Sequence, residues 1–108
     1  MAEEIIYIGS YDNTIDLLLN SDGVPIPLST VTRIDANISG IDVTSTNQGS
    51  DLIRWDQAGY VEGEARCKFG GVTGLAEGYA QLWLTLYEPT NPNGVVFGPI
   101  HIEIHELP

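Results

Sequence analysis

The chain of 108 residues is long enough for one folded domain and too short for two ordinary ones, which excludes most doubly wound and barrel enzymes. Lysine and arginine together number 4 against 15 aspartate and glutamate residues, so the formal net charge is −11 and such a surface repels nucleic acid. One cysteine cannot form an internal disulfide, and acidic N-terminal residues without a long apolar run predict a soluble protein, made in the cytoplasm, that does not enter a membrane.

Apolar and polar residues alternate along most of the chain, and no window has the spacing of an amphipathic helix. A period of two is typical of half-buried β-strands. In the first half of the chain this pattern predicts strands over residues 4–11, 14–20, 29–39, 41–46 and 51–56. A turn at 21–23 follows the second strand, and Pro25 and Pro27 restrict the next segment to a sheet edge or a crossover, because proline has no N–H for a ladder.

The second half of the chain continues the same pattern. A strand over residues 61–69 places Cys67 inward and its charged residues outward, namely Glu62, Glu64, Arg66 and Lys68. A glycine-rich link over 70–78 follows, with one helical turn expected near Leu75. The last two strands, 79–87 and 95–106, flank a tight loop.

These elements predict an all-β fold. About seven to nine strands at regular spacing, separated by Gly, Pro and Asn turns, are typical of an antiparallel two-layer β-sandwich. No repeat, linker or low-complexity segment divides the chain, so we expect a single domain over residues 1–108.

Several segments follow one another in a recognisable order: TIDLLLN, SDGVPIPLSTVT, RIDANIS, LIRWDQAGYVEGEARCKFGG and a closing hairpin that contains LYEPTNPNGVVFGPI. This order resembles that of the small immunoglobulin-like sandwich modules of tailed-bacteriophage virion proteins, from about Ile5 to Leu107. The resemblance implies a non-enzymatic particle subunit in the virion, as a capsid decoration, neck, tail or baseplate component. It also implies partners that are other virion proteins or copies of itself, and it supplies no catalytic residue. The Cys, Trp and Cys spacing of antibody domains is absent, because Cys67 is the only cysteine.

Aromatic residues mark the outward side of the strand over residues 79–87. Tyr79, Trp83 and Tyr87 recur at every fourth residue, with Gln81 and Thr85 between them. Aromatic side chains with polar tips are favoured at the centres of protein interfaces, so this row is the predicted contact face of a homo-oligomer or larger assembly. Two alternatives stay open: the strand is buried on both faces with Trp83 in the core, or the rings form a sugar platform in a carbohydrate- or receptor-binding module.

Histidine and glutamate share one face of the last strand. His101, Glu103 and His105 alternate there, and imidazole and carboxylate groups are suitable zinc ligands. No Cys-x-x-Cys or His-Glu-x-x-His pattern accompanies them, so an exposed polar face is the preferred interpretation. A pH-sensitive assembly contact is the alternative.

Other reactive residues do not form a catalytic pattern. Glu62 and Glu64 alternate with Arg66 and Lys68 as surface charges do, and Cys67 is expected to face inward. The glycines near residue 70 lack the Gly-Lys-Ser/Thr ending of a phosphate loop. We therefore expect no enzymatic activity, no metal and no cofactor.

The positive charges gather in the middle of the chain, while acidic residues dominate both ends. The cations are Arg33, Arg54, Arg66 and Lys68. Separate acidic and basic faces would orient identical copies relative to one another, or orient the module on a larger shell. Such surface charges would contribute little to the binding energy.

Overall fold

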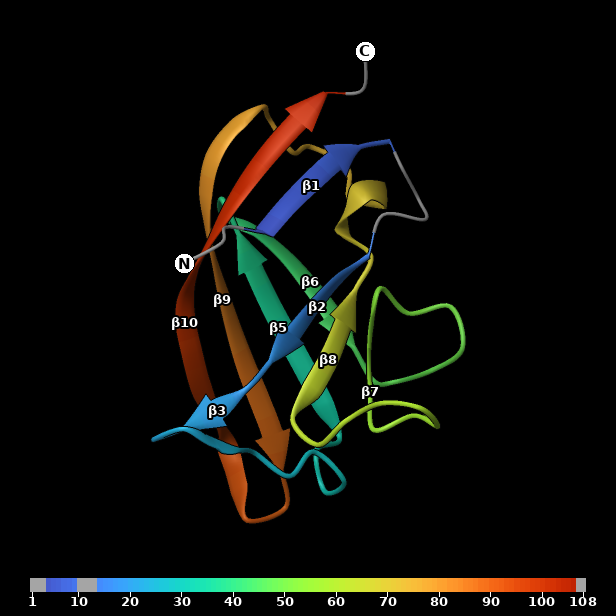
Figure 1. The fold of residues 1–108 in the computed structure, drawn as a ribbon, viewed down its shortest axis with the longest axis vertical. Helices are drawn as coiled ribbons and strands as arrows, with labels where there is room; N and C mark the ends of the chain where they lie inside the picture. Colours follow the sequence, from blue (N-terminus) through green and yellow to red (C-terminus); the bar gives the residue numbers. More distant parts are fainter. Residues whose placement is uncertain (1–3, 10–13, 107–108) are drawn as a thin grey trace.

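The structure, a computed structural model, describes residues 4–9 and 14–106 (Figure 1). Within these residues the regular elements are strands and one short 3-10 helix, so the predicted all-β class is confirmed. No helix in the described ranges is long and apolar enough to cross a membrane. The elements are β1 (Glu4–Ile8), β2 (Ile15–Leu18), β3 (Asn20–Ser21), β4 (Val24–Pro25), β5 (Arg33–Ile38), β6 (Ile41–Ser45), β7 (Ile53–Trp55), β8 (Glu64–Cys67), η1 (Phe69–Gly71), β9 (Gly78–Glu88) and β10 (Asn91–Glu106).

The strands form three sheets. The large sheet has five strands in the order β1-β10-β9-β5-β6, the small sheet has the order β2-β8-β7, and β3 pairs with β4. The paired strands are antiparallel except for β1 and β10, which are parallel. The parallel pair departs from the antiparallel prediction. It is possible because the first and last strands are not joined by a hairpin, which would force them to be antiparallel.

The large sheet curls like half of a barrel, and the small sheet lies across one of its faces (Figure 1). The long strand β10 carries two register shifts against β9, between Asn91 and Val95 and between Phe97 and Ile100. Such irregularities bend a strand and increase its local twist. The large sheet has an inner face, which packs against the small sheet, and an outer face on the opposite side.

One hydrophobic core joins the two sheets. Buried members from β5, β9 and β10 face buried members from β7 and β8, and Ile6 on β1 and Phe69 in η1 join them: Ile34, Ile38, Leu82, Leu84, Ile102, Ile53, Trp55, Ala65 and Cys67. Trp55 also donates a hydrogen bond from Nε1 to the backbone oxygen of Val31, at 3.2 Å, so its one polar atom is satisfied. Full burial of each large apolar side chain contributes about 1.5–3 kcal/mol before entropy losses.

Three details of the chain differ from the sequence prediction. The helical turn expected near Leu75 lies earlier, at η1, and Leu75 is buried in the following loop. Glu64, expected on a charged outer side, is buried because Arg66 binds its carboxylate and the N–H of Val61 donates to it. Val61 lies before β8 and is exposed. The end of the first predicted strand, residues 10 and 11, lies outside the described residues.

Candidate functional site

The predicted aromatic row lies on the outer face of the large sheet. Tyr79 is 80% exposed and Trp83 is 39% exposed, whereas Tyr87 is partly buried. The alternating residues Leu82 and Leu84 are fully buried in the core. Trp83 is therefore not a core residue, because its side chain projects from the outer face of β9. The contact role of the row remains a prediction.

Glycines on the neighbouring strand make room for two of the rings. A Cβ atom at Gly98 would lie 3.0 Å from Trp83 Cε3, and one at Gly94 would lie 3.0 Å from Tyr87 Cε1. Both glycines belong to β10, which pairs with β9. Each ring thus occupies the space that a side chain on β10 would otherwise fill. Packing against the β10 backbone therefore holds the ring in place.

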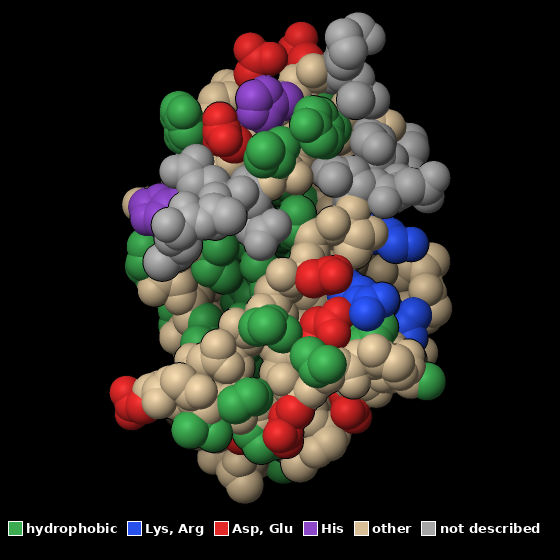
Figure 2. All heavy atoms as spheres, in the orientation of Figure 1, with side chains coloured by type: hydrophobic (Ala, Val, Ile, Leu, Met, Phe, Trp, Pro, Cys, Tyr) green, Lys and Arg blue, Asp and Glu red, His purple; other side chains and the backbone are tan. Residues whose placement is uncertain are grey.

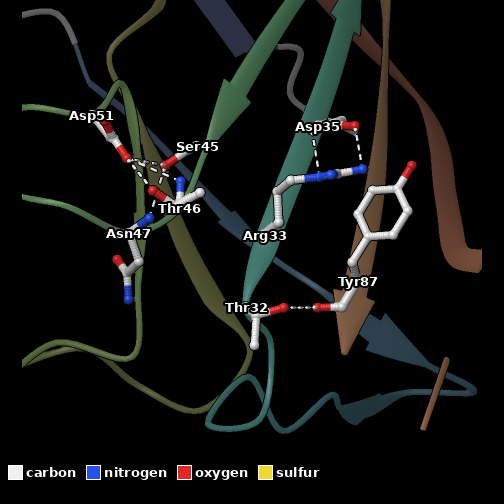
Figure 3. A network of polar contacts seen from close by, with 8 residues as sticks. All are labelled: Thr32, Arg33, Asp35, Ser45, Thr46, Asn47, Asp51 and Tyr87. Carbon is white, nitrogen blue, oxygen red and sulfur yellow. Dashed lines mark hydrogen bonds and ion pairs between the residues drawn. The ribbon is translucent and has the colours of Figure 1, made fainter. Parts of the chain in front are cut away.

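Polar contacts hold the Tyr87 end of the row (Figure 3). The guanidinium of Arg33, directly opposite on β5, lies 4.0 Å from the centre of the Tyr87 ring. Arg33 also contacts Asp35, with Nη2 3.3 Å from Oδ2 and Nε 3.2 Å from Oδ1. The Nε contact is an ion pair without hydrogen-bond geometry, so the buried Oδ1 atom of Asp35 has no hydrogen bond in the described part of the molecule.

Glu88 is the last residue of β9 and precedes the short loop to β10. Its carboxylate accepts hydrogen bonds from Thr30 Oγ1 at 2.7 Å, Asn91 Nδ2 at 2.8 Å and Thr90 Oγ1 at 2.9 Å. These donors, that of Thr30 foremost, hold the pKa of Glu88 below its usual value. The β9–β10 connection is therefore tied to the chain before β5.

A shallow groove of about 310 Å³ lies beside Trp83, and we call it the Trp83 groove. The ring of Trp83 is accompanied there by carboxylate, amide and hydroxyl groups from β5, β6 and β9, namely Asp35, Asn37, Asp42, Thr44 and Thr85. The Nδ2 of Asn37 donates to Asp42 Oδ1 at 2.8 Å, which fixes the orientation of the amide. An aromatic wall with several hydrogen-bonding groups can bind the backbone of another protein or the hydroxyls of a sugar.

The predicted histidine face is on the same sheet. His101 lies opposite Gln81 and Glu103 lies opposite Tyr79, so both join the outer face near the Tyr79 end of the row. His105 Nε2 is 3.4 Å from Glu103 Oε1, and the His105 ring lies 5.9 Å from that of Tyr7 on β1. Across the described ranges, no group of three or more His, Cys, Asp or Glu residues is placed to hold a metal ion.

Sequence reasoning missed the apolar residues that other strands add to this surface. Ile5 and Tyr7 on β1 are 36% and 38% exposed, and Val96 on β10 is 61% exposed. Their outward direction follows from strand alternation, but their proximity to the row depends on pairing between distant segments. They lie with the aromatic row on the outer face of the large sheet.

The four Lys and Arg residues are divided between the large and the small sheet. Arg33 is on the outer face, whereas Arg54, Arg66 and Lys68 lie on the small sheet or directly after it, around one surface depression. The gathering of positive charge expected from the sequence is thus concentrated on the side of the molecule that the small sheet covers.

Comparison of the chain with protein-family models, curated proteins and solved structures finds no significant match.

Proposed function

We propose that the protein is a non-enzymatic assembly subunit that binds other proteins through its outer face. The observation that carries this proposal is Trp83, a large aromatic side chain 39% exposed in the middle of a sheet face and beside a groove of polar groups. An exposed ring of this kind has no role in the core, which uses Trp55 instead. Surface aromatic residues flanked by polar groups are typical of binding hot spots.

The geometry suits a preorganised contact. The rings of Trp83 and Tyr87 rest above glycines of β10, and Arg33 supports Tyr87 from β5. Binding then requires little ordering of these side chains, so less conformational entropy is lost on association. Burial of their remaining exposed area contributes about 25 cal/mol per Å².

The setting that we propose is a bacteriophage particle. Support comes from the motif order that resembles immunoglobulin-like virion modules, together with an all-β fold whose two main sheets share one core. In this proposal the two sheets are the layers of an immunoglobulin-like sandwich. The subunit serves as a capsid decoration, neck, tail or baseplate component, and its partners are other virion proteins or further copies of itself.

Replacement of Trp83 by glutamate tests the proposal. A charge at this position would have to be desolvated in the contact, so W83E should lower both the oligomer mass measured by light scattering and the binding to purified phage particles. The matched control is V24E, because Val24 is 65% exposed on the separate β3–β4 ladder. Assembly by W83E at the level of V24E, with an unchanged circular dichroism spectrum, would reject the outer face as the contact.

A second candidate function is a carbohydrate- or receptor-binding module. The Trp83 groove favours it, because carboxylate and amide groups beside an indole ring can bind the hydroxyls of a stacked sugar. A glycan array followed by titration separates the two functions. A sugar binder saturates as an isolated monomer, whereas an assembly subunit shows no saturable glycan binding.

A further inference from the structure

The side of the molecule formed by the small sheet gathers positive charge. Three of the chain's 4 Lys and Arg residues line a depression of about 470 Å³ there: Arg54, Arg66 and Lys68. Figure 2 shows the Lys and Arg atoms close together on one side of the surface. The other lining residues are Thr14, Asp16, Tyr60 and the loop at residues 49–52. We call this depression the basic pocket.

Strand register brings the cations together. Arg54 on β7 lies directly opposite Arg66 on β8, and Lys68 follows Arg66 two positions along the chain. Like charges directly opposite each other in a ladder are destabilising. In a chain of net charge −11, three of the 4 cations nevertheless lie close together.

Two of the three cations have no carboxylate partner within the described residues. Arg54 donates from Nε to Asn47 Oδ1 at 3.0 Å and from Nη1 to the oxygen of Gly49 at 2.9 Å, and both acceptors are neutral. These bonds orient the guanidinium without neutralising it. Lys68 is exposed, and its ammonium makes no ion pair in the same part of the chain.

Arg66 is held differently and forms the back of the pocket. It binds the buried carboxylate of Glu64, its Nε lies 3.7 Å from Asp16 Oδ1, and its guanidinium stacks 4.1 Å from the centre of the Tyr60 ring. These contacts fix its planar group in one place. A fixed guanidinium is better prepared for an anion than a mobile one.

Asp51 lines the pocket, and one oxygen of its carboxylate, Oδ2, is held by the loop after β6. It accepts hydrogen bonds from the N–H of Thr46 at 2.9 Å and the N–H of Gln48 at 3.1 Å, and Ser45 Oγ lies 3.3 Å away (Figure 3). All of these hydrogen bonds are accepted by Oδ2, and within the described residues Asp51 makes no ion pair with Arg54 or Lys68. The other described carboxylate that lines the pocket, Asp16, lies beside Arg66.

We propose that the basic pocket binds a small molecule through a phosphate or carboxylate group. Guanidinium and ammonium groups bind such oxyanions by charge-assisted hydrogen bonds, and the volume is within the usual range of small-ligand sites. A second copy of this chain is the less suitable occupant, because two molecules of charge −11 repel each other whereas a small anion brings one or two charges. The site does not depend on the proposed assembly function.

The test is a titration with inorganic phosphate, and separately with citrate, at constant ionic strength. Binding is monitored through the amide chemical shifts in NMR spectra. Wild type should show saturable shifts at β7, β8 and residues 49–52. Arg54→Gln and Lys68→Gln should each weaken binding about tenfold, because each removes a charge-assisted contact. Arg33→Gln is the matched control, because Arg33 is the cation outside the pocket, and it should bind as wild type does.

Lys68→Gln keeps the test decisive if Arg54→Gln disturbs the loop that Arg54 binds, because Lys68 has no such contacts to lose. Equal binding by wild type, Lys68→Gln and Arg33→Gln would overturn the proposal, as would shifts that rise linearly without saturation. A lower oligomer mass for Lys68→Gln in the absence of added anion, without saturable phosphate or citrate binding by wild type, would also overturn it and identify a second copy as the occupant.

Discussion

At the residue scale, the two tryptophans show how one residue type takes two roles. Trp55 is 1% exposed and donates its indole N–H to Val31, whereas Trp83 is 39% exposed on a sheet face. The difference follows from position within strand alternation, because the neighbours Leu82 and Leu84 take the inward places on β9. The exposed indole is then available to another molecule.

Alanine substitutions at the two tryptophans should have unequal effects on stability. W55A should lower the free energy of unfolding by about 3–5 kcal/mol, because it leaves a cavity in the core. W83A should lower it by less, about 1–2 kcal/mol, since Trp83 is already 39% exposed to water. Urea unfolding followed by circular dichroism measures both. Equal losses would mean that Trp83 contributes to the core.

Asp51 gives the loop after β6 a dependence on pH. The N–H groups of Gln48 and Thr46, in that order, hold the pKa of Asp51 below its ordinary value of 3.8, with Ser45 adding a further hydrogen bond. A carboxyl whose pKa is lower in the folded state stabilises the fold above its unfolded pKa. That contribution is lost as the pH falls through the lowered folded value.

The substitution Asp51→Asn should therefore destabilise the protein at neutral pH and lose this effect in acid. The difference in free energy of unfolding between wild type and D51N should be constant from neutral pH down to about one unit above 3.8 and should shrink below 3.8. Urea unfolding at a series of pH values measures it. A difference that persists unchanged in strong acid would show that the Asp51 charge does not carry the effect.

At the element scale, the register irregularities of β10 shape the outer face. Gly98 follows Phe97 at one of them and has φ of +139°, and a Cβ there would lie 2.9 Å from the backbone oxygen of Leu82. Glycine is therefore needed for two reasons, conformation and space. The strand bends here, and the Trp83 ring lies over the gap.

Gly98→Ala should destabilise the fold and displace Trp83. We expect a loss of about 1–3 kcal/mol, from backbone strain and from contact with β9, together with a change in tryptophan fluorescence. Gly49→Ala is the control, because a Cβ atom at Gly49 would have no heavy atom within 4 Å and the residue has no positive φ. Equal unfolding midpoints for the two variants would contradict the role of Gly98.

Most strands could be predicted from the sequence because alternation is a local property. The pairing of β1 with β10 could not, because it joins segments from opposite ends of the chain and no local pattern encodes it. The prediction that Glu64 is exposed was wrong for a related reason. A charged side chain indicates exposure, yet Arg66 and the N–H of Val61 bind the carboxylate of Glu64 in its buried position. Burial of a charge depends on partners that alternation does not reveal.

At the scale of the whole molecule, the candidate site was predictable only along one strand. The spacing of Tyr79, Trp83 and Tyr87 on β9 is local and could be read directly. The Trp83 groove needs Asn37 and Asp42 from β5 and β6, and their position depends on sheet order. Sequence alternation identifies which residues face outward but not which outward residues become neighbours.

Net charge determines how assembly should respond to salt. Copies of charge −11 repel each other, while the outer face contributes mainly apolar and aromatic contact. Screening is effective beyond about 8 Å at physiological ionic strength, so added salt should strengthen self-association. Light scattering across a series of sodium chloride concentrations tests this expectation. Weaker association with added salt would indicate a contact made by complementary charges instead.

The most direct measurement follows the two indole N–H resonances of the protein by NMR, in the monomer and in the assembled state. Trp55, already bonded to Val31, serves as the internal reference. Solvent exchange at the Trp83 indole should slow on assembly, while that at Trp55 should stay unchanged. A Trp83 indole that exchanges as fast in the assembly as in the monomer would contradict this prediction.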